Sequence, residues 1–119
     1  MSDFYFSEAS IKRKREISDG EYKADLQSEI KTLADHHYRV ILTLAIKKEE
    51  LEIRVVACAD FTSLSVDLDY ESEKKVIRVN TVAIMFPFIR SQVTLLTSQP
   101  GMTPIVLPAI NTARFAEEN

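Results

Sequence analysis

Apolar and polar residues alternate with a period of two through about the first two thirds of this sequence, and this alternation most constrains the fold. It places every second side chain on one face of a strand, so that each strand has one buried face. The pattern is clearest over Tyr22–Ala34 and Tyr38–Ile46. From Asn80 the apolar residues recur with a helical period instead. Strands followed by helices predict an α+β fold, with residues 1–119 forming one domain.

Four antiparallel strands are expected, each with an apolar face. The first changes the parity of its apolar positions, which predicts a bulge near Ser7–Glu8. In the fourth strand the apolar residues also change from odd to even positions, which predicts that the strand continues to Tyr70 with a bulge near Thr62–Ser63. The apolar residues are Phe4, Phe6, Ala9, Ile11 and Ile17; Tyr22, Ala24, Leu26 and Ile30; Tyr38, Val40, Leu42, Leu44 and Ile46; Leu51, Ile53, Val55, Ala57, Ala59 and Phe61, then Leu64, Val66, Leu68 and Tyr70.

The connections between these strands carry turn signals. Asp19-Gly20 is a dipeptide favoured in hairpin turns, and Lys47–Glu50 is a short polar connection. After the helix, Pro100-Gly101, Pro104 and Pro108 predict a stiff, extended segment. The residues Ala109–Asn119 are expected to form a short second helix, whereas Ser72–Val79 has no clear pattern.

The long helix after Asn80 has two apolar stripes. One stripe can pack on the strands: Val82, Met85, Phe86, Ile89, Val93 and Leu96. The other holds Ile84, Phe88 and Leu95, with Gln92 beside them. Because one neighbour cannot cover both, we expect Ile84, Phe88, Gln92 and Leu95 to contact a second copy of the chain. Pro87 is expected to kink the helix or to mark where its regular part begins, and Ser98–Pro100 to end it.

Composition and motifs argue against several kinds of function. The net charge of -3 argues against nucleic-acid binding, and no glycine-rich phosphate loop occurs. The single Cys58 fits a reducing cytoplasm. The longest apolar run, Val82–Ile89, is too short to cross a membrane. We therefore expect a cytoplasmic protein that is not inserted in a membrane, needs no cofactor, and has no catalytic residue or metal site.

Several side chains remain as weaker candidates for function. Lys12–Arg15 is interpreted as a charged strand edge rather than a nucleic-acid contact, and His36-His37 as a solvated turn rather than a metal site. Cys58 is interpreted as packing rather than as a nucleophile. Two carboxylate clusters are interpreted as solvated charge rather than acid–base pairs: Glu49, Glu50 and Glu52, and Asp67, Asp69 and Glu71.

Two segments in the last third resemble the SecB family of protein-export chaperones. They are Met85-Phe86-Pro87-Phe88-Ile89-Arg90 and the run from Gly101 to Asn111, and they have the order and nearly the separation found in that family. The resemblance implies a Greek-key antiparallel sheet with helices on one face. It also implies a homo-dimer or homo-tetramer that holds unfolded polypeptide in apolar grooves, with protein export as a candidate role, and that catalyses no reaction.

The binding strip predicted from this resemblance and from the prolines is Met102, Ile105, Val106 and Leu107, with Tyr22 beside it. Prolines hold the strip extended, so that binding a chain costs less entropy. Packing of this strip on the core is an equally good interpretation. Arg90 is expected to have a structural role.

This chain also departs from the family pattern. Only Asp19-Gly20-Glu21 stands where the family has a long, aromatic-rich crossover between its first two strands, and Met102-Thr103 replaces a phenylalanine-proline pair. The alternative function is therefore a structural or adaptor oligomer that keeps the fold without export chaperone activity, with a dedicated protein partner instead of unfolded clients.

Overall fold

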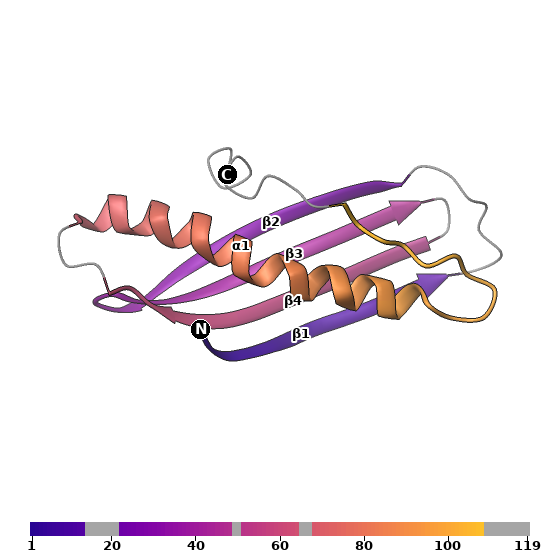
Figure 1. The fold of residues 1–119 in the computed structure, drawn as a ribbon, viewed down its shortest axis with the longest axis horizontal. Helices are drawn as coiled ribbons and strands as arrows, with labels where there is room; N and C mark the ends of the chain where they lie inside the picture. The colour runs from indigo at the N-terminus through magenta and orange to yellow at the C-terminus, as the bar shows by residue number, and fades with distance from the viewer. Residues whose placement is uncertain (14–21, 49–50, 65–67, 109–119) are drawn as a thin grey trace.

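Four antiparallel strands and one long helix form the protein in the computed structural model, which describes residues 1–13, 22–48, 51–64 and 68–108 (Figure 1). The elements are β1 (Ser2–Arg13), β2 (Lys23–Ala34), β3 (His37–Lys48), β4 (Leu51–Thr62) and α1 (Tyr70–Thr97). The strands form one sheet in the order β1-β4-β3-β2. The predicted α+β fold is thus confirmed, and β1 lies beside β4 as in a Greek key. The second helix expected over Ala109–Asn119 lies outside the described residues.

The turn signal at Asp19-Gly20 does not correspond to a hairpin between neighbouring strands. β1 pairs with β4, and β2 pairs with β3 at the opposite edge of the sheet. The connection that holds Asp19-Gly20 therefore joins two strands that are not neighbours, and residues 14–21 themselves lie outside the described residues. A turn dipeptide predicts a local reversal of the chain, but it cannot say which strand becomes the next partner.

The bulge expected in β1 is confirmed. The register between β1 and β4 shifts between Phe6 and Glu8, and again between Ser2 and Tyr5. Asp3 lies within the shift between Ser2 and Tyr5 and has a φ of 51°. Because of the shift between Phe6 and Glu8, Phe4, Phe6 and Ile11 all reach the core, although the two phenylalanines have even numbers and Ile11 an odd one. Ile17 lies outside the described residues.

The core lies between one face of the sheet and the inner face of α1. β3 and β4 supply it with alternating residues, as predicted, because each strand turns every second side chain to that face. Buried on this face are Tyr38, Val40, Leu42, Leu44, Ile46, Leu51, Ile53, Val55, Ala57, Ala59 and Phe61. The predicted inner stripe of α1 is buried against them, except Leu96, which is partly buried.

The helix begins ten residues earlier than predicted, and β4 ends where the second bulge was expected. β4 stops at Thr62, and the amide of Ser63 donates to the carbonyl of His36 at 2.7 Å. The Asp69 side chain caps α1 by accepting from the Ser72 amide at 2.7 Å. Leu64 is 91% exposed, so the period-two pattern after Thr62 does not reflect a buried strand face. The first turns of α1 were missed because few of their side chains are apolar.

Pro87 does not interrupt α1, which is continuous over 28 residues. A proline in a helix frees the carbonyl four residues before it, here that of Ala83. Ala83 and Pro87 both lie on the exposed side, so water can hydrogen-bond this carbonyl.

By length and composition alone, α1 could cross a membrane, contrary to the expectation based on Val82–Ile89. Core helices of soluble proteins meet the same criterion, and the inner face of α1 packs on the sheet. We therefore interpret it as a core helix.

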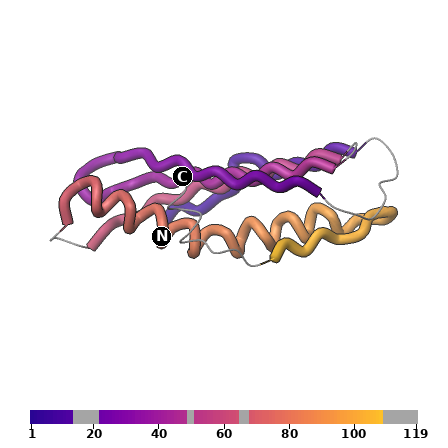
Figure 2. The backbone as a smooth tube through the Cα atoms, turned by 90° about the horizontal axis from the view of Figure 1, so that it is seen from above, coloured from indigo at the N-terminus to yellow at the C-terminus, as the bar shows by residue number. Residues whose placement is uncertain are grey.

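After α1 the chain turns back along the helix as an extended segment, the return segment (Gly101–Pro108). Both it and α1 lie on the same face of the sheet (Figure 2). Its residues form no helix or strand, in agreement with the stiff connection predicted from the prolines. It runs across the end of the sheet from the helix toward β2 (Figure 1).

Candidate functional site

Three side chains of α1 hold the return segment by its backbone. Thr94 Oγ1 donates to the Ile105 carbonyl at 2.9 Å, and Thr97 Oγ1 accepts from the Ile105 amide at 2.8 Å. Arg90 Nε donates to the Leu107 carbonyl at 2.9 Å. Because residues at i, i+4 and i+7 share one face of a helix, Arg90, Thr94 and Thr97 form a row opposite the segment. The hydrogen bond from Arg90 to the Leu107 carbonyl is a structural contact of the kind expected for this residue.

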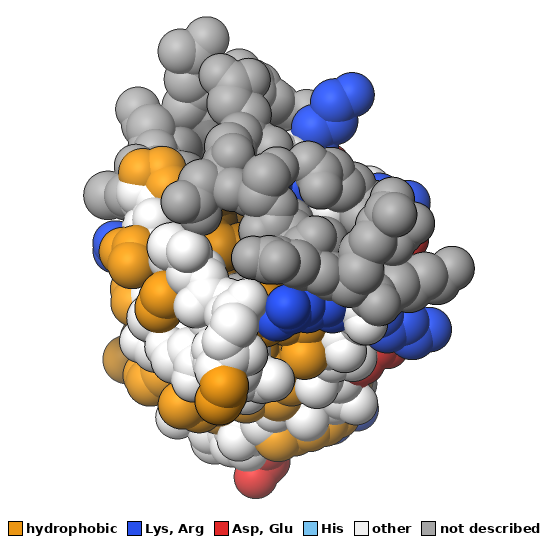
Figure 3. All heavy atoms as spheres, turned by 90° about the vertical axis from the view of Figure 1, so that its right-hand side faces the viewer, with side chains coloured by type: hydrophobic (Ala, Val, Ile, Leu, Met, Phe, Trp, Pro, Cys, Tyr) orange, Lys and Arg blue, Asp and Glu red, His pale blue; other side chains and the backbone are white. Residues whose placement is uncertain are grey.

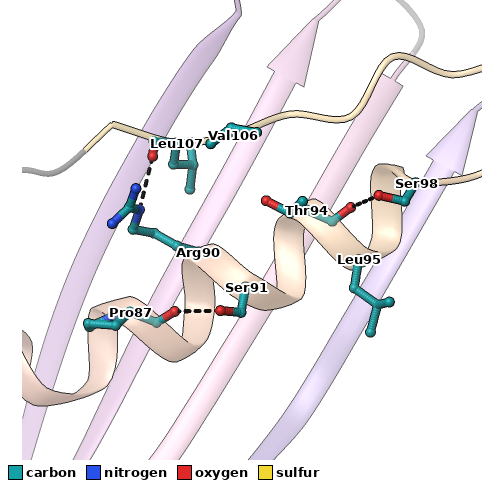
Figure 4. A pocket seen from close by; sticks show the side chains of 8 residues that line it. All are labelled: Pro87, Arg90, Ser91, Thr94, Leu95, Ser98, Val106 and Leu107. Carbon is teal, nitrogen blue, oxygen red and sulfur yellow. Dashed lines mark hydrogen bonds between the residues drawn. The ribbon is translucent and has the colours of Figure 1, made fainter.

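Leu107 separates two grooves beside the return segment. The β2 groove has a volume of about 230 Å³ and is lined almost entirely by apolar groups: Tyr22, Ala24, Leu26, Leu44, Phe86, Leu107 and Pro108. The helix groove has a volume of about 580 Å³ and mixes apolar and polar side chains: Pro87, Arg90, Ser91, Thr94, Leu95, Ser98, Val106 and Leu107 (Figure 4). Only Leu107 lines both.

The structure divides the predicted binding strip among three places. Tyr22 and Leu107 meet in the β2 groove, although they are far apart in the sequence. Val106 is 68% exposed and lines the helix groove. Met102 and Ile105 are partly buried against the core and line neither groove. Sequence reasoning missed Ala24, Leu26 and Phe86 as groove residues, although their apolar patterns placed all three on the core side.

The β2 groove lies at an edge of the sheet. β2 is the last strand in the sheet order, so its outer edge pairs with no strand of the described residues. Backbone groups on such an edge can pair with another extended chain. Among the described residues, the groove therefore combines an apolar lining with a strand edge that pairs with no other strand.

The outer stripe of α1 is exposed in the described chain. Ile84 is 45% exposed, Phe88 46% and Leu95 67%. Gln92 is partly buried. Phe88 packs on Phe4 of β1 with ring centroids 4.9 Å apart, so the stripe contacts the sheet edge at this residue. Contact of this stripe with a second copy stays a prediction.

Seen from the end where α1 stops, hydrophobic side chains gather toward one flank, and Lys and Arg side chains lie mainly toward the other (Figure 3). In Lys12–Arg15, only Lys12 and Arg13 are described. A side chain on Gly101 would lie 3.4 Å from the Arg13 guanidinium, so Arg13 sits directly against the return segment. Lys12 is exposed, as expected of a charged strand edge.

A cluster of polar side chains joins the start of α1 to the turn between β2 and β3. Glu73, although only 3% exposed, accepts from the Tyr38 hydroxyl and pairs with His36 Nδ1 at 2.7 Å. The Tyr38 hydroxyl, more than His36, holds the pKa of Glu73 below its ordinary value. Burial raises the pKa of Tyr38 to about 12, and Glu73 adds to this shift.

The sequence did not predict this cluster, because Glu73 lies in the stretch without a clear pattern and His36 was interpreted as solvated. Neither groove is lined by these side chains, so we interpret the cluster as structural. In the part of the chain that is described, no group of three or more possible metal ligands occurs. Cys58 is buried, with Sγ 3.8 Å from Ser7 Oγ, as expected for packing.

Comparisons with known proteins agree with this fold. The family described as preprotein translocase subunit SecB matches residues 6–118. The protein-export protein SecB of Saccharophagus degradans is 26% identical over 91 residues, which cover 73% of this chain and 54% of that protein. The uncharacterized protein MJ0357 of Methanocaldococcus jannaschii is 40% identical over 35 residues, which cover 29% of this chain and 23% of that protein. The chain spans about half the length of the first of these relatives and a smaller share of the length of the second.

A solved structure shares the arrangement of strands and helix. It is the Mycobacterium tuberculosis Rv1957 SecB-like chaperone in complex with a ChAD peptide from the Rv1956 HigA1 antitoxin. The TM-score is 0.69 at 14% sequence identity, and the match covers 91% of this chain and 84% of that chain. At this identity the likeness shows the fold alone.

Proposed function

This chain belongs to the SecB family, and we propose that it is a non-enzymatic chaperone that binds unfolded or extended polypeptide in the β2 groove. The observation that carries the proposal is the meeting of Tyr22 and Leu107 in an apolar groove beside the outer edge of β2, which pairs with no other strand among the described residues. The peptide bound to the SecB-like chaperone of similar fold supports it. A cytoplasmic homo-oligomer and a role in protein export are parts of the same proposal.

The chemistry of the groove suits an extended chain. Apolar side chains of a client gain free energy when they leave water for the lining of the groove. The client backbone can pair with the outer edge of β2, and such backbone pairing depends little on the client's sequence. Broad and weak binding is therefore expected.

Suppression of aggregation tests this function. We expect the wild-type protein to slow the aggregation of a reduced, unfolded client. Ala24→Glu should abolish the effect, because it places a charge in the groove lining at an exposed position that tolerates it. Gln27→Glu is the matched control, since it adds the same charge on β2 at an exposed position outside the groove.

Each result has a distinct meaning. If the wild-type protein does not slow aggregation, the chaperone function is wrong, and the exposed stripe of α1 favours the structural or adaptor oligomer. If Ala24→Glu is as active as the wild type, the function stands but the β2 groove is not its site. Met102→Ser with Ile105→Ser is a poorer test, because both side chains pack on the core.

A further inference from the structure

The start of α1 (residues 70–81) is docked on the sheet largely through polar side chains, and we propose that protonation of Glu73 releases it while the rest of the helix stays docked. The buried residues in this part are Glu73, Ile77 and Thr81. Further along the helix the buried residues are mostly apolar: Val82, Met85, Phe86, Ile89, Val93 and Thr97. The inference goes beyond the proposed function, because Glu73 and Thr81 line neither groove.

The two parts of α1 differ in how strongly they are docked. Burial of apolar side chains stabilises a contact roughly in proportion to the area removed from water. The start of α1 contributes only Ile77 to this term, whereas every buried residue of the later turns except Thr97 is apolar. The later turns also hold the return segment through their polar row. The start of α1 therefore depends on hydrogen bonds for a larger share of its docking.

Glu73 connects the start of α1 to two other segments. Its carboxylate accepts from the hydroxyl of Tyr38 at the start of β3, and it pairs with His36 Nδ1 at 2.7 Å in the turn before β3. A hydrogen bond from Ser63, just after β4, adds to these contacts. The Ser63 amide also donates to the His36 carbonyl at 2.7 Å, which joins the two segments to each other. One buried carboxylate thus holds the helix to both.

A proton on Glu73 disturbs these contacts because it turns an acceptor into a donor. In the ionised carboxylate one oxygen accepts from Tyr38, and the other pairs with His36. A protonated Glu73 donates through one oxygen, so one of these two partners must then accept. An imidazole in acid carries a proton on both nitrogens and cannot accept, which leaves only the Tyr38 hydroxyl for that role. The extra strength of hydrogen bonds to a charged group is lost as well.

The groups around Glu73 keep it ionised at neutral pH. Tyr38 faces it from β3, and His36 faces it from the turn. Tyr70 of α1 and Asp35 of the turn lie near enough to Tyr38 to interact with it electrostatically. The hydrogen bond from Tyr38, more than any other contact, holds the pKa of Glu73 below 4.5. Docking through Glu73 is therefore present above pH 4.5 and is lost as the pH falls through the folded pKa.

A second carboxylate caps the same end of α1. Asp69 accepts from the Ser72 amide at 2.7 Å, and this hydrogen bond holds the pKa of Asp69 below its ordinary value. Glu71 and Glu73 add negative charge to the first turn, which the helix dipole favours. By contrast, residues 82–97 contain no Asp or Glu. Acid therefore weakens the start of α1 and leaves the side-chain charges of its later turns unchanged.

Release of the start of α1 uncovers apolar surface at one end of the molecule. Tyr38 and Ile77 are buried while the helix is docked. The start of α1 and the β2–β3 turn lie at one end of the sheet, whereas Tyr22 of the β2 groove precedes β2 at the other end (Figure 1). The release thus changes the exposed apolar surface at a place separate from that groove.

Hydrogen exchange of backbone amides, corrected for the intrinsic effect of pH, tests the release in the wild-type protein. Between about pH 6 and about pH 3.5, the protection of amides in residues 74–81 should fall about three- to tenfold. Amides in residues 88–97 should change by less than about twofold. An equal loss in both parts would show that α1 detaches as one unit, and unchanged protection of residues 74–81 would show that Glu73 does not control the docking. Either result overturns the proposal.

Three variants test whether Glu73 is responsible. Glu73→Gln removes the titrating charge and should remove most of the pH dependence in residues 74–81. Asp69→Asn keeps a good helix cap without the charge and should retain most of it. Asp60→Asn is the matched control, because a hydrogen bond from Arg39 lowers the pKa of Asp60 too, but this pair lies on the face of the sheet away from α1.

The variants can also contradict the proposal. A pH dependence that survives in Glu73→Gln and disappears in Asp69→Asn would assign the effect to the cap, and its loss in Asp60→Asn would assign it to the outer face of the sheet. Both outcomes overturn the role of Glu73. If Glu73→Gln does not fold, the comparison of the two parts of α1 in the wild-type protein decides.

Discussion

At the residue scale, the buried carboxylate of Glu73 is the side chain whose charge depends most clearly on the fold. It hydrogen-bonds with both Tyr38 and His36, and these contacts join the first turns of α1 to the β2–β3 turn and the start of β3. Burial raises the pKa of a carboxylate that has no donors, whereas hydrogen bonds from Tyr38, His36 and Ser63 lower the pKa of Glu73. Its pKa in the folded chain is thus below the ordinary value of 4.5. Folding stability gained in this way is present above pH 4.5 and is lost as the pH falls through the folded pKa.

Tyr38→Phe removes the donor that lowers this pKa most. At pH 7 we expect the free energy of unfolding in urea to fall by about 1 to 3 kcal/mol, because the Glu73 charge stays buried with one donor fewer. Below pH 4.5 the gap between the variant and the wild type should narrow, since protonation removes the charge in both. A gap that is independent of pH would show that Tyr38 acts through packing alone.

At the element scale, α1 has different partners on its different sides. Its inner stripe packs on the sheet, the row Arg90, Thr94 and Thr97 holds the return segment, and the outer stripe is exposed. Only the first of these could be predicted in full from the sequence, because an apolar stripe indicates burial directly. The polar row could not, since threonine is common on exposed helix faces and its partner, the Ile105 backbone, has no sequence signal of its own.

Thr97→Val tests the attachment of the return segment. The substitution keeps the volume of the side chain but leaves the Ile105 amide without its acceptor. We expect a loss of about 1 to 3 kcal/mol in unfolding free energy and faster hydrogen exchange of that amide. Ser98→Ala serves as the control, because the hydroxyl of this exposed residue donates to the Thr94 carbonyl within the helix and not to the return segment. Similar exchange of the Ile105 amide in both variants would contradict the attachment.

Ile84→Asp and Leu95→Asp test the outer stripe. Both positions are well exposed in the single chain, so the substitutions should leave its fold intact. If the stripe contacts a second copy, each buries an unpaired charge there and should weaken self-association about tenfold or more in sedimentation experiments. Lys75→Asp, an exposed position on the same helix, should have less effect. An unchanged oligomer in both stripe variants would exclude this surface as the interface.

At the scale of the whole molecule, the protein is a thin body in which one helix covers one face of a four-stranded sheet. Its dimensions are 53 × 26 × 17 Å. So thin a body leaves apolar side chains exposed at the helix surface and at both edges of the sheet, among them Tyr5, Leu33 and Leu95. Contacts between copies are the simplest way to remove such side chains from water.

The melting temperature should therefore depend on protein concentration. Association stabilises the folded state by mass action, so a hundredfold increase in concentration should raise the melting temperature by about 5 °C or more. Scanning calorimetry or circular dichroism measures this directly, and Ile84→Asp should reduce the dependence. A melting temperature that stays constant over that range would indicate a monomer.

The sequence by itself determined the buried faces of the strands and the inner stripe of the helix. Those features depend on the side-chain period of each element, which is a local property of the chain. Tyr38 to Ile46 and Leu51 to Phe61 are buried in the predicted alternation, and the bulge after Phe6 follows from a change of parity. The family resemblance likewise rested on contiguous residues around Pro87 and Gly101.

Only the tertiary structure decided which strands pair, where α1 begins and how the grooves form. Strand order joins residues far apart in the chain, so a turn signal at Asp19-Gly20 could not reveal that β1 pairs with β4. The start of α1 depends on a cap and on the Glu73 cluster rather than on an apolar stripe. The β2 groove exists because Tyr22 and Leu107 meet across the end of the sheet, and no local period records a contact between segments so distant in sequence.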